Sequence, residues 1–137
     1  MNRLDFQEIA VLRFEESRVL LAAGFSDGAY YLAGYAVECA LKSCIAKRTR
    51  EHDFPDKKLV NDSHTHDLTK LLQLAELKVD LEQAMQGNPA MQSSWDAVQD
   101  WSETSRYERK SLQEATDLLV AIEDQNGGLL PWIKLHW

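Results

Sequence analysis

The sequence predicts an all-α protein, an antiparallel bundle of four to five helices. Apolar residues recur at the three- and four-residue spacing of amphipathic helices, most clearly between residues 29 and 47. Turn-forming residues separate these segments, for example Gly24 and the run Gly87-Asn88-Pro89. No segment alternates apolar and polar residues in the manner of a strand. We therefore expect helices joined by turns, without a sheet.

The composition indicates one globular domain over residues 1–137. Hydrophobic residues make up 45% and charged residues 27% of the chain, which is not the profile of a disordered protein. No apolar run has the length of a membrane span, and residues 1–14 carry charges throughout, unlike a secretory signal. We expect a cytoplasmic protein without membrane contact. The net charge of −7 argues against a general nucleic-acid binder, which normally has a basic surface.

Residues 4–23 are predicted to form the first helix and residues 28–48 the second. The residues expected on the core face of the first helix are Ala10, Phe14, Leu21 and Phe25. Gly24 is expected to end this helix, and Ser26 or Asp27 to cap the next one. Because the turn is short, the two helices should be antiparallel neighbours.

The second helix is predicted to be the central one, because it carries two different faces. Its apolar face consists mainly of small or branched residues that allow close packing: Ala33, Ala36, Val37, Ala40, Leu41, Cys44 and Ile45. On the opposite face, Tyr31, Tyr35, Glu38 and Lys42 follow one another at steps of four, three and four residues. Glu38 and Lys42 have the favourable order for an ion pair along a helix. If Glu38 is buried it needs a cationic partner, and Arg106 is the candidate.

Cys39 and Cys44 lie on this same helix, five residues apart. They point in different directions and cannot easily form a disulfide. We predict two buried thiols, as is common in a reducing compartment.

Residues 49–65 lack a sustained period and are predicted to form a loop. Helices follow over residues 67–77, 79–86 and 89–101, the second of them either separate or a bend of the first. Pro89 suits the first turn of a helix. The inward-facing residues expected in these segments are Leu68, Leu71, Leu72, Ala75, Leu81, Met85, Met91, Trp95 and Val98.

A last long helix is predicted over residues 110–124, after a polar interruption at residues 102–107. Its inward-facing residues are expected to be Leu112, Ala115, Leu118, Leu119 and Ile122. The aromatic tail at residues 129–137 adds a short helix after Pro131, and its apolar residues serve packing or an interface.

Arg106, Tyr107, Arg109 and Lys110 form a basic and aromatic cluster at the start of the last long helix. A guanidinium presents a fork of donors that fits a phosphate, and the start of a helix adds unpaired N–H groups. A neighbouring tyrosine can stack on a base. The cluster predicts a nucleotide or RNA-phosphate site. The alternative is structural, with Arg106 paired to a nearby glutamate and Tyr107 packed over a helix end.

His52, His64, His66 and Asp67 are residue types that can bind zinc. No cysteine lies near them in the sequence, and we predict neither a metal nor a cofactor. The alternative role for this segment is capping of the helix at residues 67–77, by Thr65, His66 or Asp67.

Several segments resemble the HEPN family, small four- to five-helix domains found widely in prokaryotes. They are LAGYAVECALKSCIA at 32–46, HDLTKLL at 66–72, Trp101 followed by Arg106-Tyr107, and LPWIK at 130–134. The resemblance spans nearly the whole chain in the same order. It implies an all-α bundle that forms a homodimer. It also implies RNA cleavage, nucleotide binding or partnership with a nucleotidyltransferase, as in toxin–antitoxin or defence systems.

The catalytic motif of the ribonuclease members is incomplete in this sequence. Those members have an Arg followed, after four to six residues, by a His. Arg106 matches the Arg, but Ser111, Leu112 and Gln113 stand where the His should be. A metal-independent ribonuclease needs a group that takes the proton of the ribose 2′-hydroxyl, so no catalytic residue is assigned. Glu38 matches the acidic position of the family's central helix.

Three functions are consistent with these observations. The first is binding of a nucleotide, RNA or a nucleotidyltransferase without cleavage. The second is a ribonuclease toxin in which His66 or Tyr107 carries the proton. The third is a scaffolding bundle whose tail at residues 129–137 docks a partner. The residues assigned to ligand binding are Glu38, Lys42, His66, Arg106, Tyr107 and Arg109.

Overall fold

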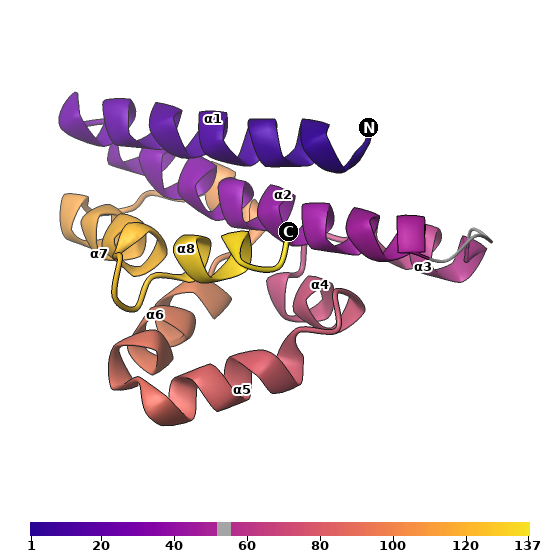
Figure 1. Cartoon of the computed structure of the whole chain (residues 1–137). Coiled ribbons are helices and arrows are strands. Elements are labelled where there is room, and N and C mark those ends of the chain that lie inside the picture. Colours follow the sequence, from indigo (N-terminus) through magenta and orange to yellow (C-terminus); the bar gives the residue numbers. More distant parts are fainter. Residues whose placement is uncertain (52–55) are drawn as a thin grey trace.

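A computed structural model describes residues 1–51 and 56–137, without the side chains of residues 50 and 51. These residues form helices and no strand, which confirms the predicted all-α class. Two long helices, α1 (Arg3–Ala22) and α2 (Ser26–Glu51), run antiparallel along one side of the molecule (Figure 1). The shorter elements are α3 (Lys57–Asp62), α4 (Leu68–Leu74), α5 (Lys78–Gly87), α6 (Pro89–Gln99), the 3₁₀ helix η1 (Glu103–Tyr107), α7 (Leu112–Glu123) and α8 (Leu129–Lys134).

Helix α2 is the centre of the fold, as predicted. It contacts α1, α4, η1, α7 and α8. Each of the seven residues of its predicted apolar face is at most 4% exposed. Since most of these side chains are small, neighbouring helices approach α2 closely. Cys39 and Cys44 on this helix are both buried and free, which confirms the prediction of two thiols.

Trp101 packs on α2 at a position where the helix has no side chain. A Cβ at Gly34 would lie 2.2 Å from two atoms of the Trp101 indole, so only glycine fits. Trp101 is 4% exposed and stacks on Tyr31 with ring centroids 6.1 Å apart. Tyr31 in turn stacks on Tyr35 at 6.2 Å. Because Trp101 closely precedes η1, this stack holds the start of η1 against α2.

The helix termini follow local sequence signals. Gly24 ends α1 with a φ of +88°, a conformation that favours glycine. Asp67 caps α4 through its side chain, which decides among the alternatives predicted for that helix. Asn88 and Pro89 open α6 in the expected positions. Glu76, with a φ of +59°, separates α4 from α5, so these are two helices and not one bent helix.

The predicted loop at residues 49–65 was wrong in part. Helix α2 continues to Glu51, and Asp56 caps the additional helix α3. None of the residues of α3 is buried, so this helix has no apolar period from which it could be predicted.

Two side chains predicted for the core are exposed. Phe25 is 65% exposed because it lies in the turn between α1 and α2. Leu112 is 57% exposed because α7 begins there and not at Lys110. It therefore lies in the first turn, at the edge of the buried face. The other predicted inward residues of α7 are buried, namely Ala115, Leu118, Leu119 and Ile122.

Ser26 and Asp27 lie in the first turn of α2 and fasten the segment between η1 and α7. The Ser26 hydroxyl donates to the Lys110 carbonyl oxygen at 2.7 Å, and an Asp27 carboxylate oxygen accepts from the Lys110 N–H at 2.6 Å. The two residues were predicted to cap α2, but their side chains instead bind the backbone of a distant segment, at Lys110.

The tail forms α8, which begins at Leu129 and not after Pro131. Its residues Leu129, Leu130, Trp132 and Ile133 are buried in the core of this same chain. Within the described parts of the chain, no helix is both long and apolar enough to span a bilayer.

Candidate functional site

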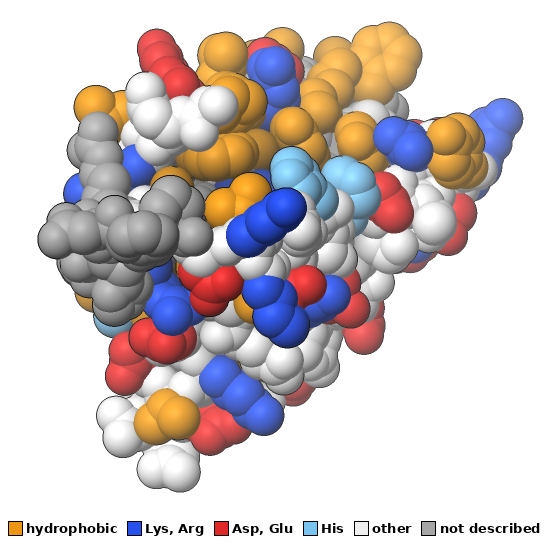
Figure 2. Space-filling view, turned by 90° about the vertical axis from the view of Figure 1, so that its right-hand side faces the viewer, with side chains coloured by type: hydrophobic (Ala, Val, Ile, Leu, Met, Phe, Trp, Pro, Cys, Tyr) orange, Lys and Arg blue, Asp and Glu red, His pale blue; other side chains and the backbone are white. Residues whose placement is uncertain are grey.

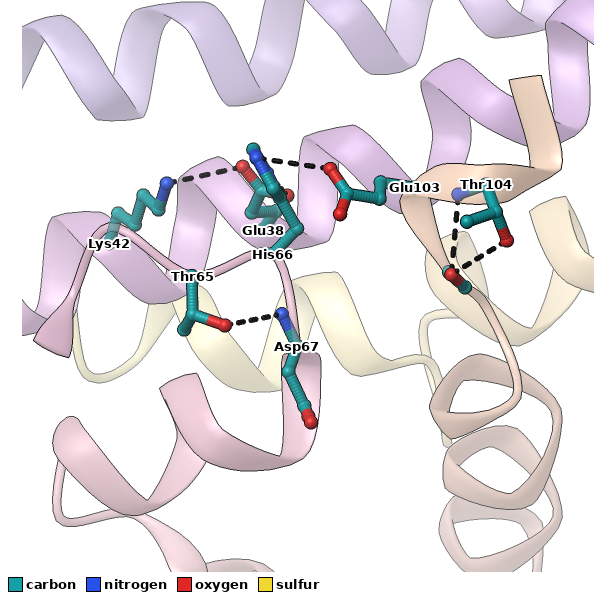
Figure 3. A network of polar contacts seen from close by, with 8 residues as sticks. Glu38, Lys42, Thr65, His66, Asp67, Glu103 and Thr104 are labelled. Carbon is teal, nitrogen blue, oxygen red and sulfur yellow. Dashed lines mark hydrogen bonds and ion pairs between the residues drawn. The ribbon is translucent and has the colours of Figure 1, made fainter. Parts of the chain in front are cut away.

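A buried carboxylate lies at the centre of a polar network between α2, the start of α4 and η1 (Figure 3). Glu38 is 2% exposed, and its Oε2 lies 3.2 Å from Nζ of Lys42. This contact is the ion pair that the spacing of the two residues predicts. The other carboxylate oxygen, Oε1, lies 2.9 Å from Nδ1 of His66. A carboxylate at this depth needs such partners, so the network is part of the fold.

His66 joins two carboxylates from different elements. Its Nε2 lies 3.1 Å from Oε2 of Glu103, the first residue of η1. The ring is carried by the loop just before Asp67, which caps α4. His66 therefore links η1 to the buried Glu38 of α2.

The predicted pair of Glu38 and Arg106 was wrong. Glu38 already has Lys42 and His66 as partners, and the Arg106 guanidinium lies over the ring of Tyr107, 4.9 Å from its centroid. Tyr107 is 79% exposed, and Arg106 is exposed as well. The neighbouring Tyr107 side chain holds the pKa of Arg106 above its usual value. Arg106 is therefore a permanent cation at the surface.

Arg106 and Tyr107 lie on η1, six and five residues before α7 begins, so the predicted contribution of the start of the last long helix is absent. Ser111 caps α7 instead. Lys110 is held by Glu108, 3.2 Å from its Nζ. In the part of the chain that the structure describes, neither Arg106 nor the exposed Arg109 forms a salt bridge. Of the four residues in the predicted cluster, three remain available to a ligand.

The positions expected for a catalytic histidine hold no proton carrier. Ser111 accepts from the Glu114 N–H as a cap. Leu112 is apolar, and Gln113 donates to Asp117 at 2.7 Å. These residues serve the start of α7 and have no contact with Arg106 among their hydrogen bonds.

The sequence model of the HEPN domain matches residues 5–125, the segment that contains the network and η1. The chain belongs to the HEPN domain family. No curated protein and no solved structure matches the chain. The family, the all-α fold and the resemblance expected from the sequence are thereby confirmed.

Within this HEPN domain, the described residues contain no group of three or more His, Cys, Asp or Glu side chains placed to hold a metal ion. His66 is engaged with carboxylates. His64 is exposed, and His52, the other histidine of the candidate zinc set, lies outside the described residues.

Two pockets of the HEPN domain flank the network. One of about 540 Å³ lies between the start of α4 and residues 99–103, and its charged lining residues are His66, Asp67, Asp100 and Glu103. Three carboxylates against one histidine make this pocket unfavourable for a phosphate. The other, of about 690 Å³, lies between α1, α2 and α3 on the side of Lys42. In Figure 2, hydrophobic side chains gather on the α1 side of this end of the molecule, above a region of mixed charge.

Sequence reasoning did not identify Glu103 and Trp101 as parts of the site. Glu103 has a local signal, since it lies three residues before Arg106 and this spacing places both on one side of a 3₁₀ helix. The signal for Trp101 is Gly34. A glycine in the middle of a helix costs about 1 kcal/mol relative to alanine, and it often marks a close approach.

Proposed function

We propose that this HEPN domain binds a phosphate of RNA or of a nucleotide at the exposed face of η1 and does not cleave it. The observation that carries this proposal is the Arg106 guanidinium stacked on the exposed Tyr107, with no salt bridge among the described residues. An arginine fork suits phosphate oxygens, and an exposed aromatic ring offers a surface on which a base can stack. Arg109, also exposed, adds a second cation near the first.

The acidic surroundings direct this ligand to η1 and away from the polar pocket. The pocket holds Asp67, Asp100 and Glu103, whereas Arg106 is not among its lining residues. With a net charge of −7, the chain repels polyanions at long range, so binding depends on the local cations and weakens as salt rises.

Binding without cleavage follows from the lack of a free base. Neither Ser111 nor Gln113 can take a proton near neutral pH. Both ring nitrogens of His66 face carboxylates, and the ring lines the polar pocket, to which Arg106 does not contribute, so His66 does not face a phosphate held by Arg106.

The test is fluorescence anisotropy with a labelled single-stranded RNA and with labelled ATP, without added metal. Arg106→Ala should weaken binding roughly 10- to 100-fold, because a charged hydrogen bond contributes about 1.5–3 kcal/mol. Lys78→Ala is the matched control: it removes one exposed cation on another element, α5, and should leave the affinity unchanged. Equal binding by the Arg106→Ala variant and the wild type would show that η1 is not the site.

The same assay separates the other hypotheses. RNA cleavage that disappears in Arg106→Ala would replace the proposal by the ribonuclease toxin. A lack of both binding and cleavage would favour a protein partner, such as the nucleotidyltransferase of a toxin–antitoxin or defence pair. We further propose a homodimer, and sedimentation velocity of the pure protein measures this directly.

A further inference from the structure

The two contacts of His66 depend on how many protons its ring carries. Each ring nitrogen lies within hydrogen-bond distance of a carboxylate oxygen, Nδ1 at 2.9 Å from Glu38 and Nε2 at 3.1 Å from Glu103. An ionised carboxylate only accepts hydrogen bonds, and a neutral imidazole has a single N–H to donate. The contact with Glu38 is a hydrogen bond and the contact with Glu103 is an ion pair, so only the imidazolium, which has a proton on both nitrogens and a positive charge, is attracted to both carboxylates.

We infer that His66 is a protonation-dependent latch that holds η1, and with it Arg106 and Tyr107, against α2. The latch is closed when the ring carries both protons. It loses one of its two contacts when the ring loses one of them.

Charged groups surround the ring on several elements. Glu38 and Lys42 face it from α2, Asp67 adjoins it at the start of α4, and Asp100 and Glu103 line the same pocket from the segment around the start of η1. Four carboxylates thus stand against one ammonium group, and that ammonium group is paired with Glu38. The His66 side chain is 46% exposed, so it exchanges its proton with water.

The unequal burial of the two carboxylates determines which contact opens. Glu38 is 2% exposed, whereas the Glu103 side chain is 39% exposed. Leaving a buried carboxylate without a donor costs more than leaving a solvated one, so the remaining N–H stays with Glu38. The deprotonated Nε2 then faces the Glu103 carboxylate with a lone pair, and Glu103 moves away into water.

Release of Glu103 acts on Arg106 because both lie on the same side of η1. A 3₁₀ helix has about three residues per turn, so side chains three positions apart are superimposed along its axis. The two ends of the segment stay fixed, through Trp101 on α2 and through the Lys110 backbone on Ser26. Opening of the latch therefore changes the orientation of η1 between fixed ends and does not detach it.

The latch can be tested without any ligand, by NMR of the whole protein between about pH 5 and about pH 8, where histidine titrates. The backbone amide signals of residues 104–107 should shift along a sigmoid that follows the His66 ring Cε1 signal. This coupled shift should disappear in His66→Gln and also in Glu103→Gln, whose altered residue is partly exposed and whose fold is expected to persist.

His64→Gln is the matched control, because the His64 ring makes no hydrogen bond or ion pair within the described residues. It should leave the shifts of η1 unchanged. The latch would be overturned if the amide signals of residues 104–107 did not shift with the His66 ring signal. It would also be overturned if they shifted equally in the His66→Gln variant.

The effect of the latch on binding rests on the proposed function, and a second measurement keeps the two apart. The probe is RNA without a terminal phosphate. Its affinity for the wild type should be roughly three- to tenfold lower at about pH 8 than at about pH 6. Its affinity for the His66→Gln variant should be the same at both pH values. If the amides titrate but no RNA binds, the latch stands and the proposed function fails. If RNA binds through Arg106 while the amides do not titrate, the proposed function stands and the latch fails.

Discussion

Replacing Gly34 by alanine tests how closely η1 is tied to the central helix. The new Cβ would lie 2.2 Å from two atoms of the Trp101 indole, whereas carbon atoms in contact are about 3.5–4.0 Å apart. The tryptophan must therefore move by about 1.3 Å or more. It is 4% exposed and has Tyr31 stacked on its ring, so any movement disturbs packed atoms.

Two limits bound the cost of Gly34→Ala. Overpacking of a core commonly costs about 1–3 kcal/mol, of which we take about 2. Complete displacement of Trp101 would return roughly 200 Å² of surface to water, or about 5 kcal/mol at about 25 cal/mol per Å². Alanine in a helix regains about 1 kcal/mol relative to glycine. The variant should therefore lose about 1–4 kcal/mol of unfolding free energy.

Urea denaturation followed by circular dichroism measures this loss. Gly87→Ala is the control, since Gly87 is the last residue of α5 and a Cβ there meets no atom within 4 Å, so its stability should equal that of the wild type or exceed it by up to about 1 kcal/mol. An NMR spectrum should show the Trp101 indole signal shifted only in the Gly34 variant. If both variants were equally stable and the Trp101 signal did not move, the argument from close packing would be refuted.

Two further predictions concern buried groups. Glu38→Ala should cost about 3–5 kcal/mol in urea denaturation, because Lys42, whose side chain is only 16% exposed, loses its charged partner. Glu38→Gln, which keeps an acceptor for His66, should cost less. Burial raises the pKa of Cys39 to about 11 and of Cys44 to about 12. Above about pH 8.5 the thiols of the unfolded chain therefore lose their protons while those of the folded chain keep them. The free energy of unfolding then falls as the pH rises, by up to about 1.4 kcal/mol per pH unit for each thiol. In Cys44→Ala the slope of unfolding free energy against pH should be roughly halved between about pH 9 and about pH 10, below the range in which Tyr35, whose pKa burial raises to about 12, also contributes. An unchanged slope would contradict this assignment.

Local interactions of the site could be predicted from the sequence. The pair of Glu38 and Lys42 depends only on the spacing of four residues along one helix, and the cap at Asp67 depends on its position before an apolar segment. The same holds for the buried face of α2. The stacked pair of Arg106 and Tyr107 also joins neighbours in the chain.

Contacts between distant segments could not be predicted in this way. The need of a buried Glu38 for a cation pointed to Arg106, but His66 occupies that place, and no sequence pattern distinguishes the two. The choice is made by the packing of the loop before α4 against α2. Helical spacing places Phe25 on the core face of the first helix, but that helix ends before it, and its place in the turn leaves it in water.

The contacts of α2 with later segments also determine the order in which the chain can fold during synthesis. The hairpin of α1 and α2 needs only the first 51 residues and can form early, with the apolar face of α2 still uncovered. Glu38 then waits for His66, 28 residues later, and Ser26 for Lys110, 84 residues later. A nascent chain therefore exposes the apolar face of α2 well before residues 106 and 107 have been synthesised.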